Sequence, residues 1–275
     1  MKYCVPYYKT FKYMEEVDEV IVPFVAEDIN FIKSLTSKEQ LLNGTVIIEI
    51  KDIYDFNNNN CIKIFIALKE NYDASVKFKL KFDSYDPQYD ELFNQLKKHN
   101  IPFFFATYAR DWDVFNGLMD LGVSDVYIVE ELGFSLGKLG PIAHAKNISI
   151  RCLANVAQSK WIKERSIKSF FIRPEDVFLY NGYVDVIEFF GENQVQYETL
   201  YKIYALNKKW FGPLYELIIG LESTVDSRSI VPIYFAKYRL NCGKRCNKGG
   251  TCSICDRFVD VAEHLLEDKG IIFKY

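Results

Sequence analysis

The sequence lacks the marks of several common protein classes. No N-terminal segment joins a basic stretch to an apolar one as a signal peptide does, and no apolar run approaches the roughly 20 residues that cross a bilayer. The HExxH motif, the Walker loop and serine-centred hydrolase motifs are missing, and no G-x-G-x-x-G follows an early strand. The three histidines all lie in or beside predicted helices and are poor site candidates. We therefore expect a cytoplasmic protein that does not enter a membrane and has no dinucleotide-binding domain.

The composition indicates a globular protein with a substantial core. The chain has 275 residues, of which 49% are hydrophobic, enough for one barrel-sized domain or two small ones. Its formal net charge of −3 argues against a surface adapted to general nucleic-acid binding, although it is compatible with a local basic patch. The 19 tyrosines and 22 phenylalanines are expected mainly in the core.

Short apolar segments alternate with helix-like segments between residues 17 and 191. Eight of the apolar segments are predicted as strands: residues 17–24, 45–50, 75–82, 101–107, 125–130, 148–155, 169–176 and 184–191. Strands that alternate with helices make right-handed crossovers and a parallel sheet. Eight of them in this length predict an α/β protein with a (β/α)8 TIM-like barrel. The main alternative is an open doubly wound sheet, which binds its ligand at the switch point of the strand order.

The two ends of the chain differ from this middle part. Residues 1–16 are rich in aromatic residues and lysine; a strand is possible there, but we assign them as an N-terminal arm before a barrel of residues 17–191. Residues 192–275 are predicted to form a C-terminal helical extension folded against the barrel. It contains two helix-like segments that are separated by a turn at residues 211–213. An amphipathic helix is predicted near its end, at 256–270.

Four of the seven cysteines lie close together in this extension, at Cys242, Cys246, Cys252 and Cys255. Four thiolates at the spacing C-x3-C-x5-C-x2-C can surround one tetrahedral metal ion without a long loop. In a reducing compartment, clustered cysteines indicate a metal site or catalysis more often than disulfides. We predict one metal centre on these residues, with zinc favoured and an iron–sulfur cluster as the alternative. Reduced structural thiols or two disulfides are the competing interpretations.

In a parallel barrel, residues at the carboxyl ends of the strands face the site. Polar residues near these positions give Glu130 and Glu188 as catalytic candidates, and Arg110, Arg151, Asn155 and Arg173 as substrate-binding candidates. Arg151 and Glu188 lie within apolar strands, where a charge costs stability unless it is paired. Either these two pair with each other inside the barrel, or they help form a site for a polar or anionic substrate. Because nearby arginines keep carboxylates ionised, we favour substrate binding over general acid catalysis for this cluster.

Part of the predicted barrel resembles a known family. The matching elements are residues 122–127, residues 143–150, Asn155, and residues 188–191, within GVSDVYIVEELGFSLGKLGPIAHAKNISIRCLANV and VDVIEFFG. These elements are similar to the barrel of the peptidase U32 family over roughly residues 100–191. The resemblance implies a barrel fold and an activity of a collagenase-like peptidase or of an iron–sulfur protein that hydroxylates RNA or quinone precursors. The family's signature cysteines follow the strand that matches residues 188–191, whereas here the clustered cysteines begin only at Cys242.

Two functions follow from these observations. The first is a metal-containing TIM-barrel enzyme of peptidase U32-like type, either peptidase-type or hydroxylase-type, that acts on a polar or anionic substrate, with RNA as one candidate. The second is a non-catalytic binding or structural protein, which uses the barrel as a scaffold and the four-cysteine metal only as a staple.

Overall fold

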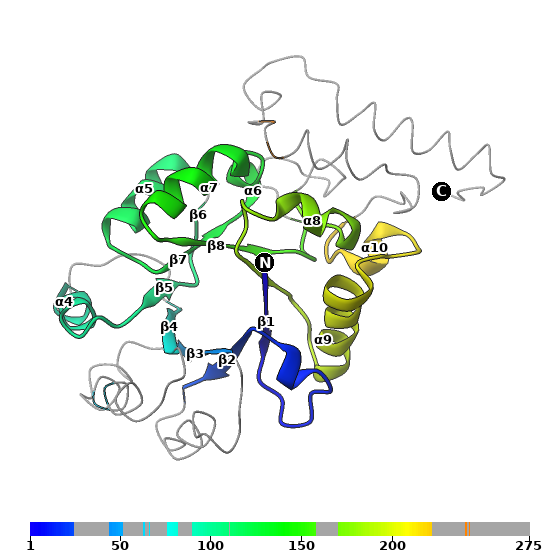
Figure 1. Cartoon of the computed structure of the whole chain (residues 1–275), viewed down its shortest axis with the longest axis horizontal. Helices are drawn as coiled ribbons and strands as arrows, with labels where there is room; N and C mark the ends of the chain where they lie inside the picture. Colours follow the sequence, from blue (N-terminus) through cyan, green and yellow to red (C-terminus); the bar gives the residue numbers. More distant parts are fainter. Residues whose placement is uncertain are drawn as a thin grey trace.

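A computed structural model describes residues 1–24, 44–51, 63, 66, 76–81, 90–109, 111–157, 170–221, 240 and 242. The described chain has an α/β fold whose centre is a parallel, nine-stranded, barrel-like sheet (Figure 1). The helices lie around the outside of this sheet. No helix in the described ranges is both long enough and apolar enough to cross a membrane.

The nine strands follow one another around the sheet with every neighbouring pair parallel. They are β1 (Lys2–Pro6), β2 (Glu19–Pro23), β3 (Thr45–Ile50), β4 (Val76–Leu80), β5 (Phe103–Phe105), β6 (Tyr108–Ala109), β7 (Asp125–Ile128), β8 (Ser149–Leu153) and β9 (Val186–Glu188). Their order is β5-β4-β3-β2-β1-β9-β8-β7-β6. The sheet is nearly closed, because the backbone N–H of Ser124, just before β7, donates to the carbonyl oxygen of Phe103 in β5 at 2.7 Å.

The helices of the described residues are short. They are the 3-10 helix η1 (Met14–Glu16), α4 (Asp90–Lys98), α5 (Trp112–Asp120), α6 (Glu130–Gly133), α7 (Leu136–Ala145), the 3-10 helix η4 (Pro174–Asp176), α8 (Val177–Tyr180), α9 (Gln194–Tyr201), the π-helix η5 (Lys202–Asn207) and α10 (Leu214–Leu217). Asp111 and Asn193 cap α5 and α9, since their side chains accept backbone N–H groups of the first turn.

Alternation along the strands divides the buried side chains between two faces. In β4, Val76, Phe78 and Leu80 pack into the large apolar core between the sheet and its helices. Lys77 and Lys79 alternate with them and therefore face the interior of the barrel. A smaller apolar cluster also lies in the interior; it consists of Cys4, Ile21, Ile47, Phe104, Tyr127 and Val186. The interior is thus partly apolar and partly charged.

The structure confirms the parallel α/β architecture and corrects two segments. Seven of the eight predicted strand segments contain a strand, but residues 170–176 have only an isolated bridge at Phe170 before η4 begins at Pro174. Proline has no N–H to donate to a sheet, which favours the end of the extended segment there. The assignment of residues 1–16 as an arm outside the barrel also needs revision, because Lys2–Pro6 form β1 between β2 and β9. The strand that the sequence offered as the alternative for residues 1–16 is therefore present as β1.

The second half of the chain is described only in part. Residues 194–207 form α9 and the π-helix, as the helical pattern there predicted, and α10 follows after Pro213. The segment from 243 to 275, which includes the predicted amphipathic helix at 256–270, lies outside the described residues.

Candidate functional site

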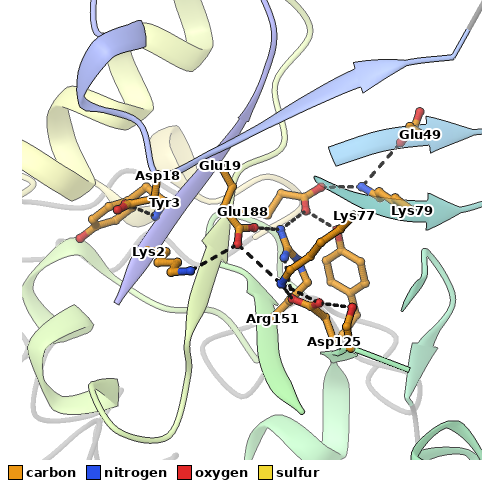
Figure 2. Close-up of polar contacts among 12 residues, drawn as sticks. Lys2, Tyr3, Asp18, Glu19, Glu49, Lys77, Lys79, Asp125, Arg151 and Glu188 are labelled. Carbon is orange, nitrogen blue, oxygen red and sulfur yellow. Dashed lines mark hydrogen bonds and ion pairs between the residues drawn. The ribbon is translucent and has the colours of Figure 1, made fainter. Parts of the chain in front are cut away.

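Charged side chains from six strands meet inside the barrel (Figure 2). They are Glu19 of β2, Glu49 of β3, Lys77 and Lys79 of β4, Asp125 of β7, Arg151 of β8 and Glu188 of β9. Burial of an ion costs several kcal/mol unless an opposite charge or hydrogen bonds compensate it. The arrangement of these side chains shows how each charge is compensated.

The first group lies toward the amino-terminal ends of the strands, and we call it the deep cluster: Glu19, Lys77, Asp125 and Arg151. Arg151 is fully buried and places Nη1 2.9 Å from Oδ1 of Asp125 and Nη2 2.7 Å from Oε2 of Glu19. Lys77 adds a second cation to Asp125, with Nζ 2.9 Å from Oδ2. The Arg151–Asp125 contact has hydrogen-bond geometry, whereas the Arg151–Glu19 contact is short but not aligned as a hydrogen bond. We therefore treat the latter as an ion pair only.

The second group lies at the carboxyl ends of the strands, and we call it the mouth: Glu49, Lys79, Lys81 and Glu188. The Nζ atom of Lys79 lies 2.8 Å from Oε1 of Glu188 and 3.6 Å from Oε2 of Glu49. Lys81 contacts the other oxygen of Glu49 at 3.0 Å and leaves 44% of its side chain exposed. In parallel α/β sheets, ligands bind at the carboxyl ends of the strands. The mouth is therefore the better candidate site.

Tyr127 of β7 lies beneath the mouth and connects it to the aromatic part of the interior. Its hydroxyl donates a hydrogen bond to Oε2 of Glu188. Its ring lies 5.3 Å from the ammonium group of Lys79, and the guanidinium of Arg151 lies 4.7 Å from the ring of Phe104. Cations over aromatic faces gain stability when they are removed from water. Lys79 and Arg151 thus each have both a carboxylate and an aromatic ring beside them.

The electrostatics favour the ionised form of two interior carboxylates, Glu188 and Asp125. Burial alone would raise the pKa of Glu188, but the positive charges of Lys79 and Arg151 outweigh burial and lower this pKa below its usual value. The pKa of Asp125 is lowered in the same way, because Arg151 and Lys77 outweigh its burial. Burial and the charge of Glu188 raise the pKa of the Tyr127 phenol. At neutral pH Glu188 is therefore an acceptor and an anion, and it has no proton to give as a general acid.

The structure brings two of the sequence candidates together. Arg151 and Glu188 both lie in the interior, with Nη2 and Oε2 3.9 Å apart. Their closer partners are other residues, Glu19 and Asp125 for Arg151 and Lys79 for Glu188. The simple pair that the sequence suggested is therefore part of a larger network.

Two other candidates have structural contacts. Asn155 uses both ends of its amide on one neighbour, because its Nδ2 donates to the carbonyl oxygen of Phe190 and its Oδ1 accepts from the N–H of Phe190, both at 2.8 Å. Arg173 is fully buried and forms a two-pronged contact with Asp176, at 2.7 and 2.8 Å. This contact closes the η4 turn.

The remaining candidates are described only in part or not at all. Glu130 begins α6 directly after β7, although its side chain is outside the described set. Cys242 is partly buried and packs against the large core. Arg110, Cys246, Cys252 and Cys255 lie outside the described residues. Within the described residues, no group of three or more histidine, cysteine, aspartate or glutamate side chains could hold a metal ion.

Sequence reasoning missed most of the network. It did not select Glu19, Glu49, Lys77, Lys79, Asp125 or Tyr127 as members of one cluster. The signal was present in the strict alternation of residues 76–80, VKFKL, but lysines in such a pattern usually face solvent. In a sheet curved into a barrel, the face opposite the helices is interior, so the alternate lysines are buried there.

The fold and the interior thus define an α/β protein with a parallel barrel-like sheet and a cluster of charged side chains at the carboxyl ends of its strands. No family model matches the chain. A curated relative, uncharacterized protease MJ1657 of Methanocaldococcus jannaschii, is 33% identical over 139 residues. The match covers 46% of this chain and only 40% of the relative, so the chain spans less than half of that protein's length. This similarity is consistent with the weak resemblance to the peptidase U32 family.

Proposed function

We propose that the chain is a TIM-barrel enzyme of peptidase U32-like type that binds a polar or anionic substrate at the mouth. In this proposal β1–β5 and β7–β9 are the eight barrel strands, and β6 is a short addition beside β7. The similarity to a protein named as a protease makes peptides the first substrate class to test, ahead of RNA. The chain's formal net charge of −3, from 34 lysines and arginines against 37 aspartates and glutamates, also favours peptides over RNA.

The observation that carries this proposal is the position of Lys79 between two carboxylates at the carboxyl ends of the strands. Its ammonium contacts Glu188 at 2.8 Å and Glu49 at 3.6 Å, and about a tenth or less of each of the three side chains is exposed. Fixed charges in a site with little water interact strongly with a bound polar group. Lys79 can donate to a substrate oxygen, and Glu188 can accept from a substrate N–H.

We also propose that Cys242, Cys246, Cys252 and Cys255 bind one metal centre, with zinc favoured. The support is the donor set itself, since four clustered thiolates in a reducing cytoplasm are typical of structural zinc sites. Such a centre would hold the C-terminal segment in a fixed conformation. The partly buried position of Cys242 against the core would join that segment to the barrel.

A non-catalytic scaffold is the second candidate, and the deep cluster favours it. Its charges are paired with one another, and Arg151 and Glu19 are both fully buried. A barrel whose interior charges serve only stability would need no substrate.

Turnover by the full purified chain distinguishes the two candidates. The chain is incubated with a mixed peptide library and, separately, with a pool of short RNAs, and the products are identified by mass spectrometry. We expect the wild-type chain to change the peptide pool, and we expect the rate of this change to fall at least tenfold in Glu188→Gln. This substitution removes the charge of the side chain but keeps its shape. Glu15→Gln, at an exposed position of η1, is the matched control. No change in either pool would refute the enzyme proposal, and full activity of Glu188→Gln would refute the mouth as its site.

A further inference from the structure

The mouth has a charged side, which is formed by β3 and β4. Glu49 and Lys79 face the interior, and alternation places Lys51 and Lys81 on the same side of these strands, one step further out. Lys51 is exposed and Lys81 is partly so. With Glu188, this gives three lysines against two carboxylates, and the two outer positions are both cationic. The charged side therefore attracts an anionic group.

The opposite side of the mouth is apolar, and it is formed where β9 ends. Phe189 is buried in the large core outside the sheet, so the next residue, Phe190, lies on the same side of the backbone as Glu188. Phe190 is 50% exposed although it follows directly on two buried residues. An exposed aromatic ring offers a flat surface on which a planar group can stack.

Asn155 fixes this aromatic side in place. Its amide holds both the N–H and the carbonyl oxygen of Phe190, and its own backbone carbonyl accepts the N–H of Ile219 at 2.8 Å. Ile219 is also exposed, at 42%. Two exposed apolar residues, Phe190 and Ile219, are thus both hydrogen-bonded through their backbones to the buried Asn155.

We infer that the ligand of the mouth carries an anionic group and a planar apolar group together. Lys51 and Lys81 bind the anion, and Phe190 stacks on the planar group and so determines specificity. Asn155 is a positioning residue, which acts through Phe190 and does not contact the ligand. This inference rests on the proposed binding role of the mouth.

Two simple probes separate the parts of this inference. The affinity of the full chain for 1-naphthalenesulfonate, which carries both groups, is measured by titration with fluorescence as the readout. The affinity for methanesulfonate, which carries the anion alone, is measured by calorimetry. We expect naphthalenesulfonate to bind at least tenfold more tightly than methanesulfonate. Phe190→Ala should weaken only the naphthalenesulfonate, by roughly fivefold to tenfold, as expected for a lost aromatic contact. Phe178→Ala, an exposed phenylalanine of α8 that precedes β9, should bind both probes as the wild type does.

The outcomes for the lysines and for Asn155 are distinct. Lys81→Met should weaken both probes. Asn155→Ala should lower the ratio between the two affinities, an effect that a general loss of stability does not produce. If Lys81→Met weakens binding but Phe190→Ala does not, the aromatic part of the inference is wrong while the proposed site stands. If neither variant changes binding, the mouth is not the site and both proposals fail.

Discussion

Lys79 and Glu188 form an ion pair across the barrel, with Nζ and Oε1 2.8 Å apart. They come from β4 and β9, which are separated by β3, β2 and β1 in the order of the sheet. A contact between them is possible only because the sheet curves until these strands face each other. The pair therefore links the closure of the barrel to the charges of the mouth (Figure 2).

Loss of Lys79 should destabilise the protein. Lys79→Met leaves Glu188 buried without its closest cation, and removal of one partner of a buried pair typically costs about 3–5 kcal/mol. Lys81→Met is the matched control, because Lys81 is much more exposed and exposed pairs contribute about 0–1 kcal/mol. Urea denaturation of both variants measures the difference. Equal midpoints for the two variants would show that the Lys79–Glu188 pair does not stabilise the fold.

The interior carboxylates should make the protein sensitive to acid. The folded-state pKa values of Glu188 and Asp125 lie below their ordinary values of 4.5 and 3.8. A lowered pKa gives stability that is present above the unfolded-state pKa and is lost as pH falls through the folded-state value. We therefore expect the free energy of unfolding to fall as the pH is lowered below about 4.5. Asp125→Asn should be less stable than the wild type at pH 7 and should lose less stability between pH 5 and pH 3. An unchanged acid slope in this variant would contradict the ionised state of Asp125.

Arg173 should contribute to stability and not to ligand binding. Its guanidinium is fully buried and closes the η4 turn through Asp176. Arg173→Ala leaves that carboxylate buried without its bidentate partner, at a cost of about 3–5 kcal/mol. Thermal unfolding and titration with methanesulfonate give the two readouts, the latter at a temperature where the variant is folded. Weaker sulfonate binding with an unchanged melting temperature would return Arg173 to the substrate-binding role that the sequence suggested.

The cysteine cluster can be tested by metal content. Cys252→Ser with Cys255→Ser removes two of the four proposed ligands, so bound metal should fall below one-tenth of the wild-type amount. The melting temperature should fall with it, because binding free energy at a structural site is folding free energy. Cys152→Ser, a buried thiol of β8 outside the cluster, is the control for loss of a cysteine. Full metal content in the double variant would overturn the assignment.

The parallel sheet could be predicted because most of its strands are short, largely apolar segments that alternate with helices, as in residues 45–50 and 148–155. The interior site could be predicted only in part. Arg151 and Glu188 were identifiable, because each interrupts an apolar strand. Lys79 was not, because its partner Glu188 is 109 residues away in the sequence and because alternating lysines resemble a solvent-facing pattern. Which face of a strand is interior depends on the curvature of the whole sheet, and local sequence does not encode that.

Asn155 illustrates a different limit. Its place at the end of a predicted strand indicated a polar residue near the site, and in the structure it lies two residues after the end of β8. Its role depends on what its amide contacts, and both ends contact the backbone of Phe190. The residue type and position were therefore informative, whereas the partner came only from the fold.

A crystal structure of the full chain soaked with 1-naphthalenesulfonate tests the central claim most directly, namely that the mouth binds the ligand. We expect the sulfonate to lie within hydrogen-bond distance of the ammonium of Lys81 or Lys51, the naphthalene ring to stack on Phe190, and the Lys79–Glu188 pair to remain intact beneath it. A well-occupied naphthalenesulfonate on the outer surface with none at the mouth would contradict the account.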